Sequence, residues 1–100
     1  MFIYNITINI NNSVHDEWLE WMKTIHIPDV MSTGMFIENR IYKVLADEDT
    51  SGTTYSVQYV CKDLSDYEKY CQQFAPDLQE AHAKKYKDKF VAFRTLLEVI

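Results

Sequence analysis

The stretch FIYNITINI, residues 2–10, alternates its side chains with a period of two. Phe2, Tyr4, Ile6, Ile8 and Ile10 would share one face of an extended strand, while residues 3, 5, 7 and 9 would share the other. This pattern over nine residues predicts a β-strand that packs one apolar face on a core. The stretch has no basic segment and no cleavage site, so we interpret it as a strand rather than a secretory signal.

After Asn11 and Asn12 the apolar residues recur at steps of three and four, which is the spacing of one helical face. The members of this face are Val14, Trp18, Trp21, Met22 and Ile25. Pro28 disfavours helical backbone at the residue before it, so we expect the helix to end or kink near Ile27. A short further turn is predicted for residues 29–33, ended by Gly34.

The rest of the chain repeats this alternation of elements. Strands are predicted at 35–45 and 53–61 around a polar turn at 46–52, followed by a helix from Ser65 that Pro76 divides in two. A last strand at 90–100 is apolar on both faces. The order strand, helix, strand, strand, helix, strand predicts an α+β, ferredoxin-like βαββαβ fold. Its antiparallel sheet would carry the helices on one face, and with no linker visible we expect one domain over residues 1–100.

The second face of that sheet would be neither bare nor fully polar. The residues predicted there are Ile3, Asn5, Thr7, Ser56, Gln58, Val60, Ala92, Arg94, Leu96, Glu38, Arg40 and Tyr42. Such a mixed lining suggests a sheet that packs on a second copy of itself and encloses a partly polar cavity. The assignment assumes that no strand contains a bulge, because a shift of one residue inverts the faces.

Composition excludes several classes of partner. The net charge of −5 argues against nucleic acid, because phosphate binding needs a basic face. No apolar run approaches the roughly 20 residues of a membrane span. The two cysteines, Cys61 and Cys71, form no CxxC pair, so we interpret them as thiols in a reducing compartment, and we expect a cytoplasmic protein.

Three stretches together carry a resemblance: HDEWLEWMK with HIPDVMSTGMF within residues 15–36, FAPDLQEAH at 74–82, and FVAFRTLLEV at 90–99. They resemble a family of short bacterial proteins of unknown function. The first helix with its tryptophans, His-x-Pro-x-x-Met at 26–31 and Gly-x-Phe at 34–36 are also similar to the dimeric α+β barrel superfamily. That resemblance implies a homodimer with a pocket between sheet and helices. The superfamily includes cofactor-independent monooxygenases, small-molecule isomerases and haem-degrading enzymes.

Three residues are candidates for catalysis. His26 could be a general base at the edge of a pocket, oriented by Asp29, or a residue that serves the end of its helix. His82 shares a helical stripe with Leu78 and could project into a cavity or pack in the core. Arg94, predicted on one face with Arg40 and Glu38, could clamp an anion or form an ion pair in an interface.

The remaining candidates would line a ligand pocket. Trp18 could wall it or belong to the core or the dimer interface, and Arg40, Tyr42 and Gln58 would line it from the second sheet face. Haem-degrading relatives pair an asparagine on the first strand with a histidine on the second helix, and Asn5 and His82 occupy roughly those places. Those relatives also carry a tryptophan on that helix, which this chain lacks.

Three functions follow from these candidates. The first is a homodimeric module that binds a small molecule in a pocket between sheet and helices. The second is a cofactor-independent monooxygenase or isomerase with His26 or His82 as base and Arg94 as anion holder. The third is a haem-binding or haem-degrading protein. The three histidines lack metal-ligand spacing, and no nucleophile or phosphate-loop motif occurs, so we expect no metal and no cofactor.

Overall fold

A four-stranded antiparallel sheet forms the base of the molecule. The computed structural model describes residues 1–45 and 50–100. The sheet has the order β2-β3-β1-β4 and consists of β1 (Phe2–Asn11), β2 (Glu38–Lys43), β3 (Gly52–Cys61) and β4 (Phe90–Glu98). This order and these connections confirm the predicted ferredoxin-like fold. β2 is shorter than the predicted strand at 35–45, and residues 46–49 of the predicted polar turn lie outside the described residues.

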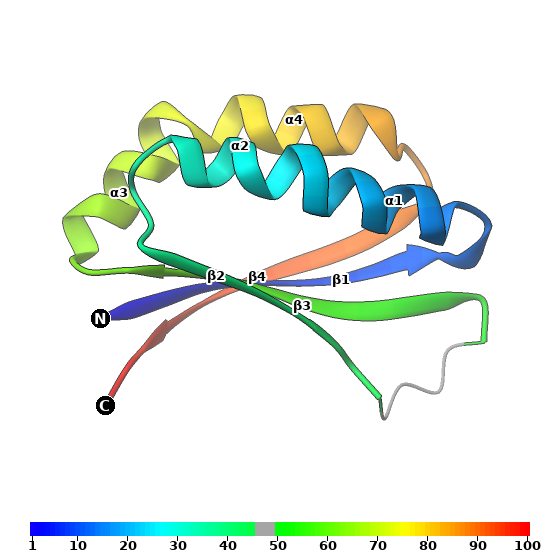
Figure 1. The fold of residues 1–100 in the computed structure, drawn as a ribbon, viewed down its shortest axis with the longest axis horizontal. Coiled ribbons are helices and arrows are strands. Elements are labelled where there is room, and N and C mark those ends of the chain that lie inside the picture. Colours follow the sequence, from blue (N-terminus) through cyan, green and yellow to red (C-terminus); the bar gives the residue numbers. More distant parts are fainter. Residues whose placement is uncertain (46–49) are drawn as a thin grey trace.

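All the helices cover one face of the sheet (Figure 1). A short 3₁₀ turn, η1 (Asn12–Val14), leads from β1 into a rod built of α1 (His15–Trp21), the π-helical segment η2 (Met22–His26) and α2 (Ile27–Ser32). The second crossover contains α3 (Leu64–Gln73) and α4 (Ala75–Lys85). Both crossovers return the chain to the same side, which leaves the other side of the sheet without helices.

Both prolines lie in the first turn of a helical segment. Pro76 lies in the first turn of α4 and separates it from α3, as predicted. Near Ile27, where the first helix is expected to end or kink, η2 ends at His26 and α2 begins with Pro28 in its first turn. A proline needs no backbone N–H at that position. The π-helical segment directly before it keeps the rod continuous, and such segments often occur at functional sites.

The core lies between the sheet and the helices. On β1 the side chains of Tyr4, Ile6, Ile8 and Ile10 are all buried, as their alternation predicts. The helices complete this core, and Trp18 is 0% exposed. Burial of one aromatic side chain removes about 150–250 Å² from water, so Trp18 is a large contributor to stability. No helix within the described ranges is both long and apolar enough to cross a membrane.

The two faces of β4 are the reverse of those predicted. Ile6 pairs with Arg94, Ile8 with Ala92 and Tyr4 with Leu96, and residues paired across an antiparallel sheet point to the same face. The prediction that Ala92, Arg94 and Leu96 lie on the second face is therefore wrong. The strand is apolar on both faces, so its pattern could not fix which face turns inward.

The second face, called the outer face below, has a polar centre and an apolar edge. On β1, β2 and β3 the residues predicted for the outer face do lie on it. Asn5 pairs with Gln58, and Gln58 pairs with Arg40, so the three side chains point to the same face. On β4 the outer face carries Val91 and Phe93, which are 70% and 63% exposed, and Leu97. The sheet thus presents uncovered apolar side chains along its β4 edge.

Candidate functional site

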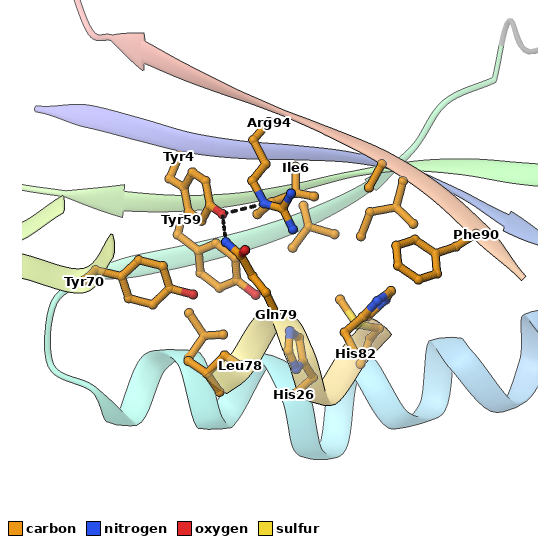
Figure 2. A pocket seen from close by; sticks show the side chains of 15 residues that line it. Tyr4, Ile6, His26, Tyr59, Tyr70, Leu78, Gln79, His82, Phe90 and Arg94 are labelled. Atoms are coloured by element: carbon orange, nitrogen blue, oxygen red, sulfur yellow. Dashed lines mark hydrogen bonds between the residues drawn. The ribbon is translucent and has the colours of Figure 1, made fainter. Parts of the chain in front are cut away.

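A cavity of about 40 Å³ lies between the helix layer and the inner face of the sheet. Aliphatic and aromatic side chains make most of its wall (Figure 2). Its polar lining residues are Tyr4, Tyr59 and Arg94 from the sheet, Tyr70, Gln79 and His82 from α3 and α4, and His26 from η2. Polar groups from three parts of the fold therefore converge on an otherwise apolar space.

A groove between α4 and the edge strand β4 lies next to the cavity. Its volume is about 560 Å³. The groove and the cavity share five lining residues, which are Gln79, His82, Phe90, Ala92 and Arg94. Small-molecule sites in proteins typically occupy roughly 300–1,000 Å³, so the groove is large enough for a ligand that reaches inward to the cavity.

His82 is held in one tautomer by Trp18. The indole Nε1 of Trp18 donates a hydrogen bond of 2.9 Å to Nε2 of His82. An indole nitrogen can only donate, so Nε2 must be unprotonated and the ring proton of neutral His82 must be on Nδ1. His82 is 7% exposed, and its ring lies edge-on to Phe90 at a centroid distance of 4.4 Å. The Trp18 contact thus makes His82 a hydrogen-bond donor through Nδ1.

Burial also keeps His82 uncharged. Loss of solvent, followed by the positive charges of His26 and Arg94, lowers the pKa of His82 to about 4. An ordinary histidine titrates near 6.5. At neutral pH the imidazole is therefore neutral, and the Trp18 hydrogen bond is fully formed.

Tyr4 joins two elements at the inner end of the groove. Nε of Arg94 donates to the Tyr4 hydroxyl at 3.0 Å, and Nε2 of Gln79 donates to it at 3.5 Å (Figure 2). Burial raises the pKa of Tyr4, although Arg94 opposes that effect, so the phenol keeps its proton at neutral pH. Both lone pairs of the oxygen are occupied, and its O–H is free to donate to another group.

His26 is the second imidazole of the cavity. Its ring stacks on Trp21 at 4.8 Å and lies 5.7 Å from the ring of His82. Burial lowers the pKa of His26, and the charge of Asp29 partly offsets this. His26 is the last residue of η2, and its side chain makes no capping hydrogen bond to α2. Its imidazole is thus a mostly neutral group on the cavity wall.

The other predicted pocket residues lie elsewhere. Asn5, Arg40, Tyr42 and Gln58 are on the outer face, where Oγ of Ser56 donates to Oδ1 of Asn5 at 2.5 Å. There the Arg40 guanidinium pairs with Glu38 at 2.8 Å, so Arg40 and Arg94 point to opposite sides of the sheet and form no common clamp. Trp18 does not line the cavity and reaches it only through His82.

The sequence interpretation missed Tyr4 and Gln79 as site residues. Tyr4 had a usable signal, since it is the one tyrosine among isoleucines on the inner face of β1. Gln79 precedes His82 by three positions on α4, so the two share a helix face. Within residues 1–45 and 50–100, no group of three or more histidine, cysteine, aspartate or glutamate residues is placed to hold a metal ion.

Several solved structures share this fold at low sequence identity. A dimeric ferredoxin-like protein from an uncultured marine organism has a TM-score of 0.72 at 17% identity, over 100% of this chain and 95% of that chain. A mutant of SnoaB, a cofactor-independent oxygenase from Streptomyces nogalater, has a TM-score of 0.68 at 11% identity, over 98% and 92%. A mutant of MhuD with two manganese protoporphyrin IX molecules per active site has a TM-score of 0.68 at 13% identity, over 100% and 95%.

At these identities the likeness shows the fold alone, and this fold is the one that the predicted resemblance implies. No curated protein matches the chain. The model of one family, a domain of unknown function, matches the sequence over residues 1–100. The chain therefore belongs to the DUF4286 family, as the predicted resemblance to a family of unknown function implies.

Proposed function

We propose that this protein is a homodimeric module that binds a small organic molecule in the cavity between sheet and helices. One observation carries the proposal: Tyr4, His82 and Arg94 line one mostly apolar cavity, and His82 and Arg94 also line the open groove beside it. An apolar pocket with a few convergent polar groups is the usual form of a small-molecule site.

The ligand would occupy the groove and place its polar end in the cavity. A cavity of about 40 Å³ holds a few water molecules and no more. The groove between α4 and β4 supplies the remaining volume. Because β4 is an edge strand, its outer side has no neighbouring strand within the described sheet that would resist a small outward movement.

The binding test uses 2-naphthol, a neutral bicyclic aromatic, in a titration followed by backbone amide NMR. We expect shift changes around Gln79, His82 and Ala92. Ala92→Leu adds bulk to both cavity and groove and should abolish them, while Thr95→Leu on the outer face of the same strand should leave them intact. Changes confined to the outer face, or none at all, would contradict the proposal.

The homodimer would form through the outer face. Val91, Phe93 and Leu97 are exposed there, and monomeric proteins rarely leave such contiguous apolar surface uncovered. Two proteins of similar fold are described as dimeric ferredoxin-like proteins, which supports a homodimer. The hydrogen bonds among Asn5, Ser56 and Thr7 would let a polar centre be covered without leaving these groups unpaired.

Native mass spectrometry reads the subunit number and any retained ligand together. We expect a dimer for the natural chain and a monomer for Phe93→Glu. Ile25, which is 49% exposed in the helix layer, provides the matched control, and Ile25→Glu should remain a dimer. A natural chain that is monomeric at micromolar concentration would refute this part of the proposal.

The cytoplasm remains the predicted location. Cys61 and Cys71 are both free thiols, and persistent free thiols suit a reducing compartment.

A cofactor-independent oxygenase or isomerase is the second candidate function, and His26 favours it. No described residue makes a hydrogen bond to its ring, and the neutral imidazole lies on the cavity wall. Such a group can accept a proton from a bound carbon acid. The test follows deuterium uptake from D₂O by 2-indanone, whose benzylic C–H groups next to the carbonyl are acidic. Uptake faster than in buffer and reduced by His26→Gln would support catalysis, and equal rates would exclude it for this substrate.

Haem is a group that these residues do not fit. Nε2 of His82 accepts the Trp18 indole N–H and Nδ1 carries the proton, so neither nitrogen is available as an iron ligand. Asn5, the other residue implied by the resemblance, lies on the opposite face of the sheet. We expect a haemin titration to give the same Soret spectrum for the natural chain and for His82→Gln, and a band lost in the variant would show that His82 ligates iron.

A further inference from the structure

We infer that the site selects a planar aromatic ligand carrying one oxyanion, a carboxylate or a phenolate, held by the Tyr4 hydroxyl, Nδ1–H of His82 and the Arg94 guanidinium. This inference rests on the proposed binding function and adds the chemical class of the ligand.

The first observation is that Tyr4 and His82 both present protons. The Tyr4 oxygen accepts from Arg94 and Gln79, which leaves its O–H to donate. Nε2 of His82 accepts from Trp18, which leaves Nδ1–H to donate. In the described chain, neither proton has a protein acceptor. Two unused donors at one cavity call for an acceptor on the ligand.

The second observation is an uncompensated positive charge. Arg94 is exposed at the rim, and among the described residues no carboxylate lies within ion-pair distance of its guanidinium. No aspartate or glutamate lines the cavity. Glu80, which lines the groove, is already paired with Lys84 at 2.9 Å. The local charge is therefore positive although the whole chain is acidic, and a single anion would balance it.

The third observation concerns the walls. Phe90 lines both spaces and is the aromatic ring of the groove, where Pro76, Ala83 and Ala92 supply aliphatic contact, while Tyr59 and Tyr70 line only the cavity. Aromatic rings pack well against such walls in edge-to-face or offset geometry. A ring system packed on Phe90 in the groove would place its oxyanion near Arg94, whose guanidinium meets the Tyr4 hydroxyl (Figure 2).

The test compares 1-naphthoate with 1-naphthamide by isothermal titration calorimetry at pH 7.5. The two molecules have the same ring and nearly the same size, and they differ in charge. We expect the natural chain to bind the carboxylate at least about 10-fold more tightly, since hydrogen bonds to a charged group contribute about 1.5–3 kcal/mol.

Two arginine variants localise the effect. Arg94→Met keeps the apolar stem and should bring the two affinities within about 3-fold of each other, because the charged contact is lost. Arg40→Met, on the outer face, should keep the natural preference. Tyr4→Phe removes one donor by a small change and should weaken naphthoate more than naphthamide, because a charged acceptor gains more from the same donor. This variant keeps the inference testable if Arg94→Met fails to fold by circular dichroism.

Each outcome has one meaning. Equal binding of naphthoate and naphthamide to the natural chain would overturn the anion inference and leave the binding function standing. Failure of both to bind, together with no response to 2-naphthol, would overturn the proposed function itself. A preference that Arg40→Met removes and Arg94→Met does not would place the anion on the outer face and refute the assignment to this cavity.

Discussion

Acidification should destabilise this protein through His82. The folded chain lowers the pKa of His82 to about 4, whereas an unfolded chain protonates histidine near 6.5. The unfolded state therefore binds more protons than the folded state between these values. The stabilising contribution is fully present above pH 6.5 and is lost as the pH falls toward 4.

The size of this effect follows from the two pKa values. The total loss is about 3 kcal/mol, of which about 2 kcal/mol has appeared by pH 5. Small domains unfold with about 5–15 kcal/mol, so the change is a large fraction of the whole. Protonation would also end the hydrogen bond from Trp18, because Nε2 would then carry a proton of its own.

Urea unfolding, followed by tryptophan emission at pH 7.5 and pH 5 and at one fixed protein concentration, measures the effect. In His82→Gln the amide oxygen can accept the indole N–H and does not titrate. This variant should lose about 2 kcal/mol less than the natural chain between the two pH values. His26→Gln removes the neighbouring imidazole, and its loss of stability between the two pH values should lie between those of the natural chain and His82→Gln. Parallel losses in the natural chain and His82→Gln would refute the reasoning.

Three further substitutions test individual contacts. Trp18→Phe should lower the free energy of unfolding by about 2–3 kcal/mol, because it leaves the buried Nε2 of His82 unpaired and removes apolar volume. Nitrogen NMR should then show that His82 loses the single Nδ1–H tautomer expected in the natural chain. An unchanged tautomer would contradict the role of Trp18. Tyr86→Phe should change the free energy of unfolding by less than about 0.5 kcal/mol or raise it, because the buried Tyr86 hydroxyl makes no hydrogen bond of good geometry within the described structure. Burial and then the nearby Glu17 carboxylate raise the pKa of Tyr86, so a loss above about 1 kcal/mol would show that the hydroxyl donates to Glu17. Gly52→Ala should lower the melting temperature by about 4–8 °C, because its Cβ would lie 2.3 Å from Oδ1 of Asn9 and would break the Asn9–Thr54 hydrogen bond, at about 1 kcal/mol. An unchanged melting temperature would contradict this account.

The fold could be predicted because each element has a local signal. The alternation from Phe2 to Ile10 fits only a strand, and the spacing of three and four residues through Trp18 fits only a helix. Pro28 marks the place where η2 ends and α2 begins, but the effect of a proline depends on its position within a helix. Proline interrupts a helix interior and is tolerated in a first turn. The sequence does not show that a π-helical segment will place Pro28 in such a turn.

The site was only partly predictable, because it depends on which way β4 faces. His26 and His82 were identified by residue type and helical spacing, and the structure places both at the cavity. Arg94 was also identified as a candidate, but the prediction placed it on the outer face together with Arg40. When a strand is apolar on both sides, its sequence does not show which side faces the core. The pairing with Tyr4 depends on register across the sheet, which is set by tertiary packing.

In the proposals above, the two faces of β4 would contact different partners. Phe90, Ala92 and Arg94 face the groove, while Val91 and Phe93 alternate with them on the face proposed for the second protomer. A ligand that shifts this strand also shifts the surface offered to the other subunit. Thermodynamic linkage then requires reciprocity: if filling the groove strengthens association, association must raise ligand affinity by the same factor. The ligand affinity of this protein would therefore depend on its own concentration.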